Sequence, residues 1–208
     1  MAKSGREGQA ERQEALLAAA AGVFAQRGYH AATVAEIAKS AHVATGTFYL
    51  YFPSKEQCFG QLVARFYETV LREVRQERRG AASVLVKLDR SVEAVLQCFR
   101  HERDLASIVL LQAFGASKAL QVRLDAIEAE LLQLLATDLA EAAGEGLIPP
   151  GDASLRAHLV LGAMRQALVY GLHQAVPAGG ADMEVRRFLL RAVGGQAGTV
   201  EEQGPATS

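Results

Sequence analysis

Residues 33–55 read TVAEIAKSAHVATGTFYLYFPSK, and the fold of the N-terminal part of the chain follows from this stretch. Thr33 and Glu36 have the spacing of a capping box, in which each side chain binds a backbone N–H group of the first helical turn. The apolar residues that follow keep the three-to-four spacing of one helical face as far as residue 38. The sequence therefore predicts a short helix that begins near Val34 and ends in a tight turn at residues 40–43.

A second short helix is predicted over residues 45–51, TGTFYLY. Pro53 ends this helix, and Ser54 and Gln57 have the spacing of another capping box, which opens a longer helix. Two short helices joined by a tight turn form a helix-turn-helix, a motif whose second helix enters the major groove of DNA.

The composition indicates an all-helical globular protein. Of the 208 residues, 50% are hydrophobic, alanine and leucine dominate, and the period-two alternation of strands is missing. There is no run of about eighteen apolar residues, and the N-terminus is too polar for a signal peptide, so we expect a cytoplasmic protein without a membrane segment. Cys58 and Cys98 lie far apart and suit reduced thiols.

The charge of the chain excludes a generally basic nucleic-acid binder. The net charge is −1, and residues 1–60 hold six Lys and Arg against five Glu, a balance of +1. This balance is weak for a DNA-binding domain. Phosphate groups would then have to be bound largely by hydroxyl groups, backbone N–H groups and helix N-termini.

The whole pattern predicts an all-α protein of about nine helices. A first helix is expected from about Ala10 to Arg27, with Gly28 as its left-handed end. Residues 1–9 are expected to form a disordered arm, and residues 195–208 a disordered tail. Periodic apolar segments predict the later helices at about 54–80, 82–101, 104–115, 117–143, 152–175 and 182–193.

The helix predicted over residues 54–80 is a mechanical link between two domains. At roughly 25 residues it is long enough to leave a small N-terminal bundle and enter a second one. We therefore predict a three-helix helix-turn-helix domain over residues 1–53 and a larger helical domain over residues 54–194.

About residues 16–66 resemble the TetR family of bacterial transcriptional repressors. The segment FAQRGYHAATVAEIAKSAHVATGTFYLYFPSKEQ, residues 24–57, combines the capped helix, the turn, a Tyr-x-Tyr-Phe close and a Ser-Lys-Glu opening in one register. Two positions depart from the family pattern. His42 stands where the family usually has glycine, in a turn suited to positive φ, and Ala44 replaces the serine that usually caps the second helix.

The resemblance implies a ligand-responsive transcriptional regulator, most often a repressor, that binds a palindromic operator as a homodimer. The C-terminal helices would form the ligand-binding and dimerisation domain. The implied partners are double-stranded operator DNA, a small-molecule effector and a second copy of the chain, with no cofactor, no metal and no enzymatic activity. By the same resemblance the DNA-binding residues are Thr33, Ala44, Thr45, Gly46, Thr47, Tyr49 and Lys55.

The chemistry of these residues fits DNA contacts. Short Thr side chains allow close approach to the groove floor, where a Thr methyl group can meet a thymine methyl group. Tyr49 and Tyr51 cannot share a helical face, so Tyr49 is expected at the DNA. Tyr51 would then pack inside with Phe48 or Phe52. Lys55 lies in the first turn of its helix, where a cation is unfavourable, and a nearby phosphate would explain it.

The effector is expected to bind among the C-terminal helices. An apolar pocket favours a hydrophobic effector, such as a fatty acyl-CoA or an aromatic compound, and arginines could meet an anionic head group. The candidate pocket residues are Arg65, Phe66, Phe99, Arg103, Leu110, Phe114, Met164, Arg165 and Leu168. Each of them could instead belong to the plain core.

Several alternatives remain open from the sequence. An apolar face on the last two helices would form a dimer interface, or it would complete the core of the monomer. The C-terminal helices could serve an enzyme or a small-molecule carrier, although they hold no catalytic constellation, or a regulator that needs no ligand. Cys58 is either a buried inert thiol or a redox sensor. His30 and His42 lack the partners of a metal site.

Overall fold

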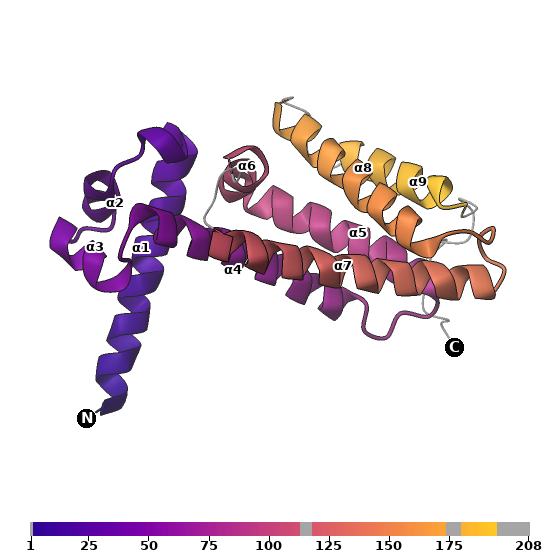
Figure 1. The fold of residues 1–208 in the computed structure, drawn as a ribbon, viewed down its shortest axis with the longest axis horizontal. Coiled ribbons are helices and arrows are strands. Elements are labelled where there is room, and N and C mark those ends of the chain that lie inside the picture. Colours follow the sequence, from indigo (N-terminus) through magenta and orange to yellow (C-terminus); the bar gives the residue numbers. More distant parts are fainter. Residues whose placement is uncertain (1, 113–117, 174–179, 195–208) are drawn as a thin grey trace, which may run out of the picture. The chain divides into compact units, whose positions relative to one another are not determined.

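The structure is a computed structural model that describes residues 2–112, 118–173 and 180–194. Within these residues the chain forms nine α-helices and no strand, which confirms the predicted all-α class (Figure 1). The helices are α1 (Ala2–Ala31), α2 (Val34–Ser40), α3 (Thr45–Tyr51), α4 (Lys55–Glu77), α5 (Val84–His101), α6 (Arg103–Gln112), α7 (Lys118–Gly144), α8 (Ala153–His173) and α9 (Gly180–Ala192).

Helix α1 differs from the prediction at its N-terminus. It begins at Ala2, within the segment 1–9 for which the sequence predicted a disordered arm. A polar sequence shows no buried face, but Lys, Arg, Glu, Gln and Ala are strong helix formers and extend a helix without one. At the other end, Gly28 has φ 75° and ψ 157°, which interrupts the helical backbone where the sequence predicted a glycine stop. One more helical turn follows, to Ala31.

The helices pack into two compact units. The first comprises Met1–Glu68 and Glu102–Asp125, and the second Thr69–His101 and Ala126–Ser208. Helices α4 and α7 therefore contribute to both units. The domain boundary predicted at residue 54 follows the sequence motif, whereas packing groups α6 and the first part of α4 with the helix-turn-helix.

The first unit has an aromatic core. Phe24 of α1, Phe48 of α3 and Phe59 of α4 are all buried. The rings of Phe24 and Phe59 meet edge to face with their centroids 5.5 Å apart, a favoured geometry for two aromatic rings. Helix α1 also packs against α2 and α6, and α2 packs against α3. This core holds the two short helices in a fixed arrangement.

In the second unit, α9 packs against both α5 and α8. Arg186 of α9 joins it to α5, because its Nε donates to Asp89 Oδ1 at 2.9 Å and its Nη1 donates to Glu93 Oε2 at 2.9 Å. Hydrogen bonding to Asp89 raises the pKa of the Arg186 guanidinium. Two carboxylates thus hold the last described helix in register on α5.

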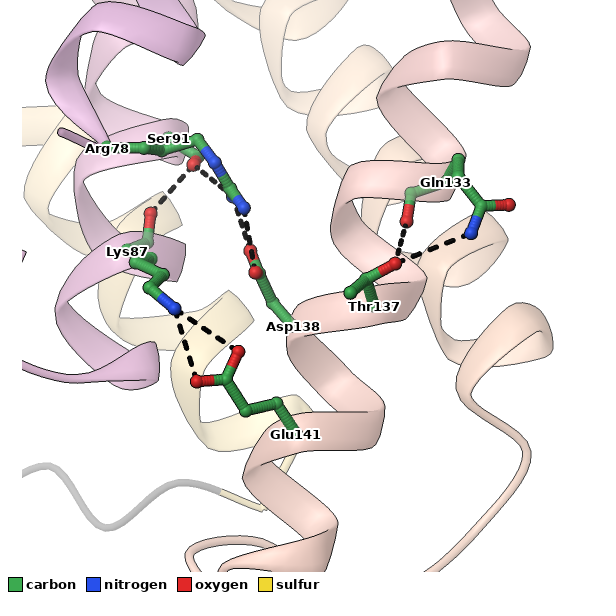
Figure 2. A network of polar contacts seen from close by, with 7 residues as sticks. All are labelled: Arg78, Lys87, Ser91, Gln133, Thr137, Asp138 and Glu141. Atoms are coloured by element: carbon green, nitrogen blue, oxygen red, sulfur yellow. Dashed lines mark hydrogen bonds and ion pairs between the residues drawn. The ribbon is translucent and has the colours of Figure 1, made fainter.

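Figure 2 shows the polar network that joins the end of α4 to α5 and α7. Arg78, directly after α4, forms a bidentate ion pair with the buried carboxylate of Asp138 on α7 and donates to Ser91 Oγ on α5 at 3.1 Å. Lys87 of α5 donates to both carboxylate oxygens of Glu141, at 3.1 and 3.2 Å. Removing one partner of a buried ion pair usually destabilises a protein by about 3–5 kcal/mol. The network therefore fixes the C-terminal end of α4.

The ends of α4 to α9 agree with the predicted ends to within about three residues, close to the ordinary uncertainty of helix boundaries. The predicted ends at residues 115 and 175, the tail over 195–208 and the candidate Phe114 lie outside the described residues. Among the described helices, none has the length and apolar character that crossing a membrane requires.

Candidate nucleic-acid interface

The capping box predicted at the start of α2 is present with both of its hydrogen bonds. The backbone N–H of Thr33 donates to Glu36 Oε2 at 3.0 Å, and the backbone N–H of Glu36 donates to Thr33 Oγ1 at 3.2 Å. The Thr33 hydroxyl also donates to Glu36 Oε2 at 2.9 Å, and this bond together with the one from the Thr33 backbone N–H lowers the pKa of the Glu36 carboxyl group. Arg27 of α1 adds an ion pair with Glu36 at 3.3 Å. The prediction is confirmed, and Thr33 has a structural role whether or not it also binds phosphate.

The turn between α2 and α3 contains the positive φ that the sequence indicated. His42 has a φ of 55°, and among the described residues it is the sole non-glycine with positive φ. Its N–H donates to Lys39 O at 3.1 Å, and the N–H of Val43 donates to Ala38 O at 3.0 Å. Histidine is tolerated in this region better than most residues, so the turn forms without the glycine usual in the family.

Only one side of helix α3 packs against the rest of the first unit. Its first residue follows Ala44, which gives no side-chain cap, although the Ala44 carbonyl accepts from Thr47 N at 2.9 Å. Phe48 is 0% exposed and its ring lies 5.4 Å from that of the buried Phe52. Helix α3 therefore begins without a side-chain cap, and Phe48 is the anchor of the helix.

The opposite side of α3 is open to solvent. Thr45, Gly46, Tyr49 and Leu50 are exposed, and Tyr49 and Leu50 are 52% and 79% exposed. Because residues four apart stand one above the other on a helix, these four form one continuous patch, which we call the α3 face. Thr47 is half-buried at its edge.

The α3 face agrees with the predicted orientation of three of the four aromatic residues in this segment. Tyr49 is outside, Phe48 and Phe52 are inside, and Tyr51 is half-buried. Contact of Thr45, Gly46, Thr47 or Tyr49 with DNA stays a prediction. Leu50 was not among the predicted residues, although its place four residues after Gly46 on the same helical face could have revealed it.

Gly46 is not required by the packing of the chain itself. A Cβ atom added there would meet no atom within 4 Å. In a helix, glycine is less favourable than alanine by roughly 1 kcal/mol. Helix α3 would therefore be more stable with alanine at position 46. The bare backbone at this position suits close approach by another molecule.

Lys55 has partners inside the first unit. Its Nζ donates to the carbonyl oxygens of Tyr29, His30 and Ala32 at 2.7, 3.3 and 2.8 Å, and lies 4.6 Å from the centre of the Tyr29 ring. These carbonyls lie at the end of α1, where a cation is favourable. The position of this lysine therefore needs no phosphate to explain it. Its contact with DNA stays a prediction.

The candidate ligand-binding residues are divided between the two units. Phe66 and Leu110 are buried in the first unit, and Phe99 and Met164 are buried in the second, where Leu168 is half-buried. Their apolar burial is compatible with a pocket wall and with plain core, so the pocket stays a prediction.

The three candidate arginines are all exposed. Arg65 of α4 forms an ion pair with Glu14 of α1 at 2.5 Å, on the surface of the first unit. This exposed pair does not test whether Arg65 binds a head group, which stays a prediction. Arg103 in the first unit and Arg165 in the second remain candidates.

Cys58 is a buried, unreactive thiol. Its side chain is 0% exposed, and burial raises the pKa of the thiol to about 12. A thiol must lose its proton to react with oxidants, so this environment disfavours a redox sensor. No group of three or more His, Cys, Asp or Glu suited to a metal ion occurs in the part of the chain that the structure describes.

Comparison with known proteins matches the motif that carries this interface. Residues 16–62 match the family described as bacterial regulatory proteins, tetR family. The uncharacterized HTH-type transcriptional regulator YdgC of Bacillus subtilis (strain 168) is 35% identical over 102 residues, which are 47% of this chain and 52% of that protein. The match thus spans about half the length of this relative.

Two further relatives match over most of their length. The fatty acid metabolism regulator protein of Bacillus subtilis (strain 168) is 27% identical over 158 residues, which are 74% of this chain and 79% of that protein. The solved structure of the fatty acid degradation regulator FadR from Bacillus halodurans superposes with a TM-score of 0.74 at 26% identity, and the match covers 85% of this chain and 97% of that chain. The similarity therefore includes the C-terminal helices.

Proposed function

Because the chain belongs to the TetR family of transcriptional regulators, we propose that it is a repressor that binds a palindromic operator as a homodimer. A hydrophobic effector bound among the C-terminal helices controls this binding. As a member of this family, the chain is a regulator and not an enzyme. The observation that carries the proposal is the α3 face, which is exposed, uncharged and anchored from behind by the buried Phe48.

The charge of the helix-turn-helix supports specific rather than general DNA binding. The balance of +1 over residues 1–60 attracts phosphate groups only weakly. Thr33, Thr45, Thr47 and Tyr49 offer hydroxyl groups that can bind phosphate oxygens without adding charge. We therefore expect modest affinity for random DNA. We also expect the protein to be located in the cytoplasm, where the chromosomal DNA lies.

The second unit offers a surface for the dimer. Leu155, Leu159 and Tyr170 of α8 and Met183 and Phe188 of α9 are exposed, and α8 and α9 pack against each other. Exposed apolar groups of this size, gathered on two adjacent helices, favour an interface with another molecule. A second copy would bury them in a two-fold arrangement, and it would present two α3 helices to successive major grooves about 34–36 Å apart.

A fatty acyl compound, such as a fatty acyl-CoA, is the effector that we favour. Two relatives of 26–27% identity are named as regulators of fatty acid metabolism or degradation, and they match the C-terminal helices as well. Within the second unit, the buried Phe99 and Met164 are apolar and suit an acyl chain. Arg165 of the same unit would meet its anionic head group.

Helix α4 is the connection that would couple the two sites, because it contributes to both units. Its N-terminal end is fixed by Lys55 and the carbonyl groups of α1, and its C-terminal end by Arg78 and Asp138. An effector changes DNA binding only if it prefers the conformation in which the two α3 helices are wrongly spaced. A displacement of α4 would supply such a conformation.

A gel-shift experiment tests the DNA-binding and effector parts separately. The probe is DNA that flanks the protein's own gene, with random DNA as competitor and a series of acyl-CoAs of increasing chain length. We expect a specific complex that long-chain acyl-CoA dissolves. Absence of specific binding would overturn the proposal. A complex that responds to no acyl-CoA, together with thermal stabilisation by polar metabolites alone, would overturn the effector assignment.

Substitution of Leu159 by arginine tests the dimer. Leu159 of α8 is 63% exposed, and Val122 of α7 is 62% exposed and provides a matched control. Leu159→Arg places a charge in the proposed interface, so the protein should become monomeric in light scattering and lose operator binding. Val122→Arg should leave both unchanged. A dimeric Leu159→Arg variant would exclude this surface as the interface.

A further inference from the structure

The α3 face lacks the side chains that most often distinguish bases. Arginine and lysine recognise guanine, and asparagine and glutamine recognise adenine, through pairs of hydrogen bonds in the major groove. The α3 face holds Thr45, Gly46, Tyr49 and Leu50, and α3 as a whole contains no charged or amide side chain. Helix α3 therefore cannot make these bidentate contacts.

The chemistry that remains on the α3 face is apolar and hydroxylic. A major groove offers one apolar feature for such a surface, which is the 5-methyl group of thymine. Leu50 is 79% exposed, the highest value among the large hydrophobic residues of the described chain that lie outside the core. No packing inside the protein accounts for a leucine in this position.

The neighbourhood of Leu50 permits contact with the groove floor. Gly46 lies one helical turn before it and has no side chain, and the space beside Gly46 is empty within 4 Å. The opposite side of α3 is fixed by Phe48, which packs on Phe52. Leu50 is thus presented by a rigid helix whose backbone can come close to the bases.

We propose that Leu50 is a specificity-determining residue that recognises thymine methyl groups in each operator half-site. The inference rests on the proposed function, since it requires that α3 lies in the major groove. It adds that the operator carries thymines at the positions facing Leu50. These thymines contribute to affinity through their methyl groups and not through their hydrogen-bonding edges.

Deoxyuridine provides the direct test, because it differs from thymidine only by the absence of the 5-methyl group. The operator is first identified by selection from random duplexes with the full-length protein. Each thymine of both half-sites is then replaced by deoxyuridine, and affinities are measured by fluorescence anisotropy. Burying one methyl group corresponds to roughly a fourfold change in affinity, so replacement in both half-sites should weaken binding by about 10- to 20-fold.

The Leu50→Ala variant assigns the effect to this residue. It should bind the thymine operator about 10- to 20-fold more weakly than the unaltered protein and should not distinguish thymine from uracil at the contacted positions. The control Val122→Ala, at another exposed apolar position, should behave like the unaltered protein. Circular dichroism melting checks that both variants are folded.

Three results would separate the possible failures. If deoxyuridine leaves the affinity of the unaltered protein unchanged, methyl recognition is excluded while DNA binding stands. If deoxyuridine weakens Leu50→Ala as much as the unaltered protein, another residue reads the methyl groups and the assignment to Leu50 is wrong. If selection yields no preferred sequence, the proposed function itself fails.

Discussion

Helices α2 and α3 have the same length, seven residues, but they are stabilised very differently. Helix α2 has a complete capping box and buries Ile37 and Ala38. Helix α3 has no side-chain cap, and Phe48 is its buried residue. It also contains Gly46, although no neighbouring atom would prevent a larger residue at this position. The comparison indicates that α2 is optimised for stability, whereas α3 keeps its surface available for another molecule.

This difference fits a division of labour within the helix-turn-helix. A short helix is unstable by itself, so α3 must depend on its neighbours for its position. Helix α2 and the aromatic residues behind α3 provide that support. Sequence features that weaken a helix in isolation, such as the missing cap, are expected where binding rather than folding determines the residue.

The first test separates the two sides of α3. Phe48→Ala should lower the free energy of unfolding by about 3–5 kcal/mol, because it removes the buried anchor of the helix. Leu50→Ala should change it by less than about 0.5 kcal/mol, since Leu50 is exposed. Urea unfolding measures both values. Equal destabilisation by the two variants would contradict the orientation of α3.

The second test concerns the contacts by which Lys55, at the start of α4, holds the end of α1. Lys55→Met removes three hydrogen bonds to carbonyl groups at the end of α1, while it retains much of the aliphatic stem. We expect a loss of about 1–3 kcal/mol in the free energy of unfolding. Operator binding is measured in parallel at several salt concentrations. If Lys55 also binds a phosphate, the slope of log K against log salt concentration would become smaller by about one. Unchanged stability would show that the carbonyl contacts contribute nothing.

The third test compares the two caps directly, with opposite expected signs. Thr33→Ala removes the cap of α2 and should destabilise the protein by about 1 kcal/mol, whereas Ala44→Ser supplies a cap to α3 and should stabilise it by up to about 1 kcal/mol. Thermal unfolding of the two variants measures the difference. A destabilised Ala44→Ser variant would mean that the start of α3 cannot adopt the cap geometry.

Short-range sequence patterns predicted much of the first unit. The capping box, the positive φ at His42 and the glycine stop at Gly28 each depend on neighbours within a few residues, so their signals are complete in the sequence. The inert environment of Cys58 was one of two predicted outcomes, and burial decided between them.

Contacts between distant residues could not be predicted in the same way. Lys55 binds carbonyl groups that are 23 to 26 residues earlier in the chain, and Arg65 pairs with Glu14 on another helix. Neither partner has a sequence signal, because a backbone carbonyl is present at every residue and surface charges are common. The helical residues before Ala10 were missed since they have no apolar periodicity.

Gly46→Ala tests the central claim, that α3 gives up stability in order to bind DNA. The added methyl group meets no atom of the chain, so the free energy of unfolding should rise by up to about 1 kcal/mol. The same methyl group should obstruct the approach of the backbone to the groove and weaken operator binding several-fold in a fluorescence anisotropy titration. A variant that is more stable and binds the operator as tightly as the unaltered protein would contradict the account.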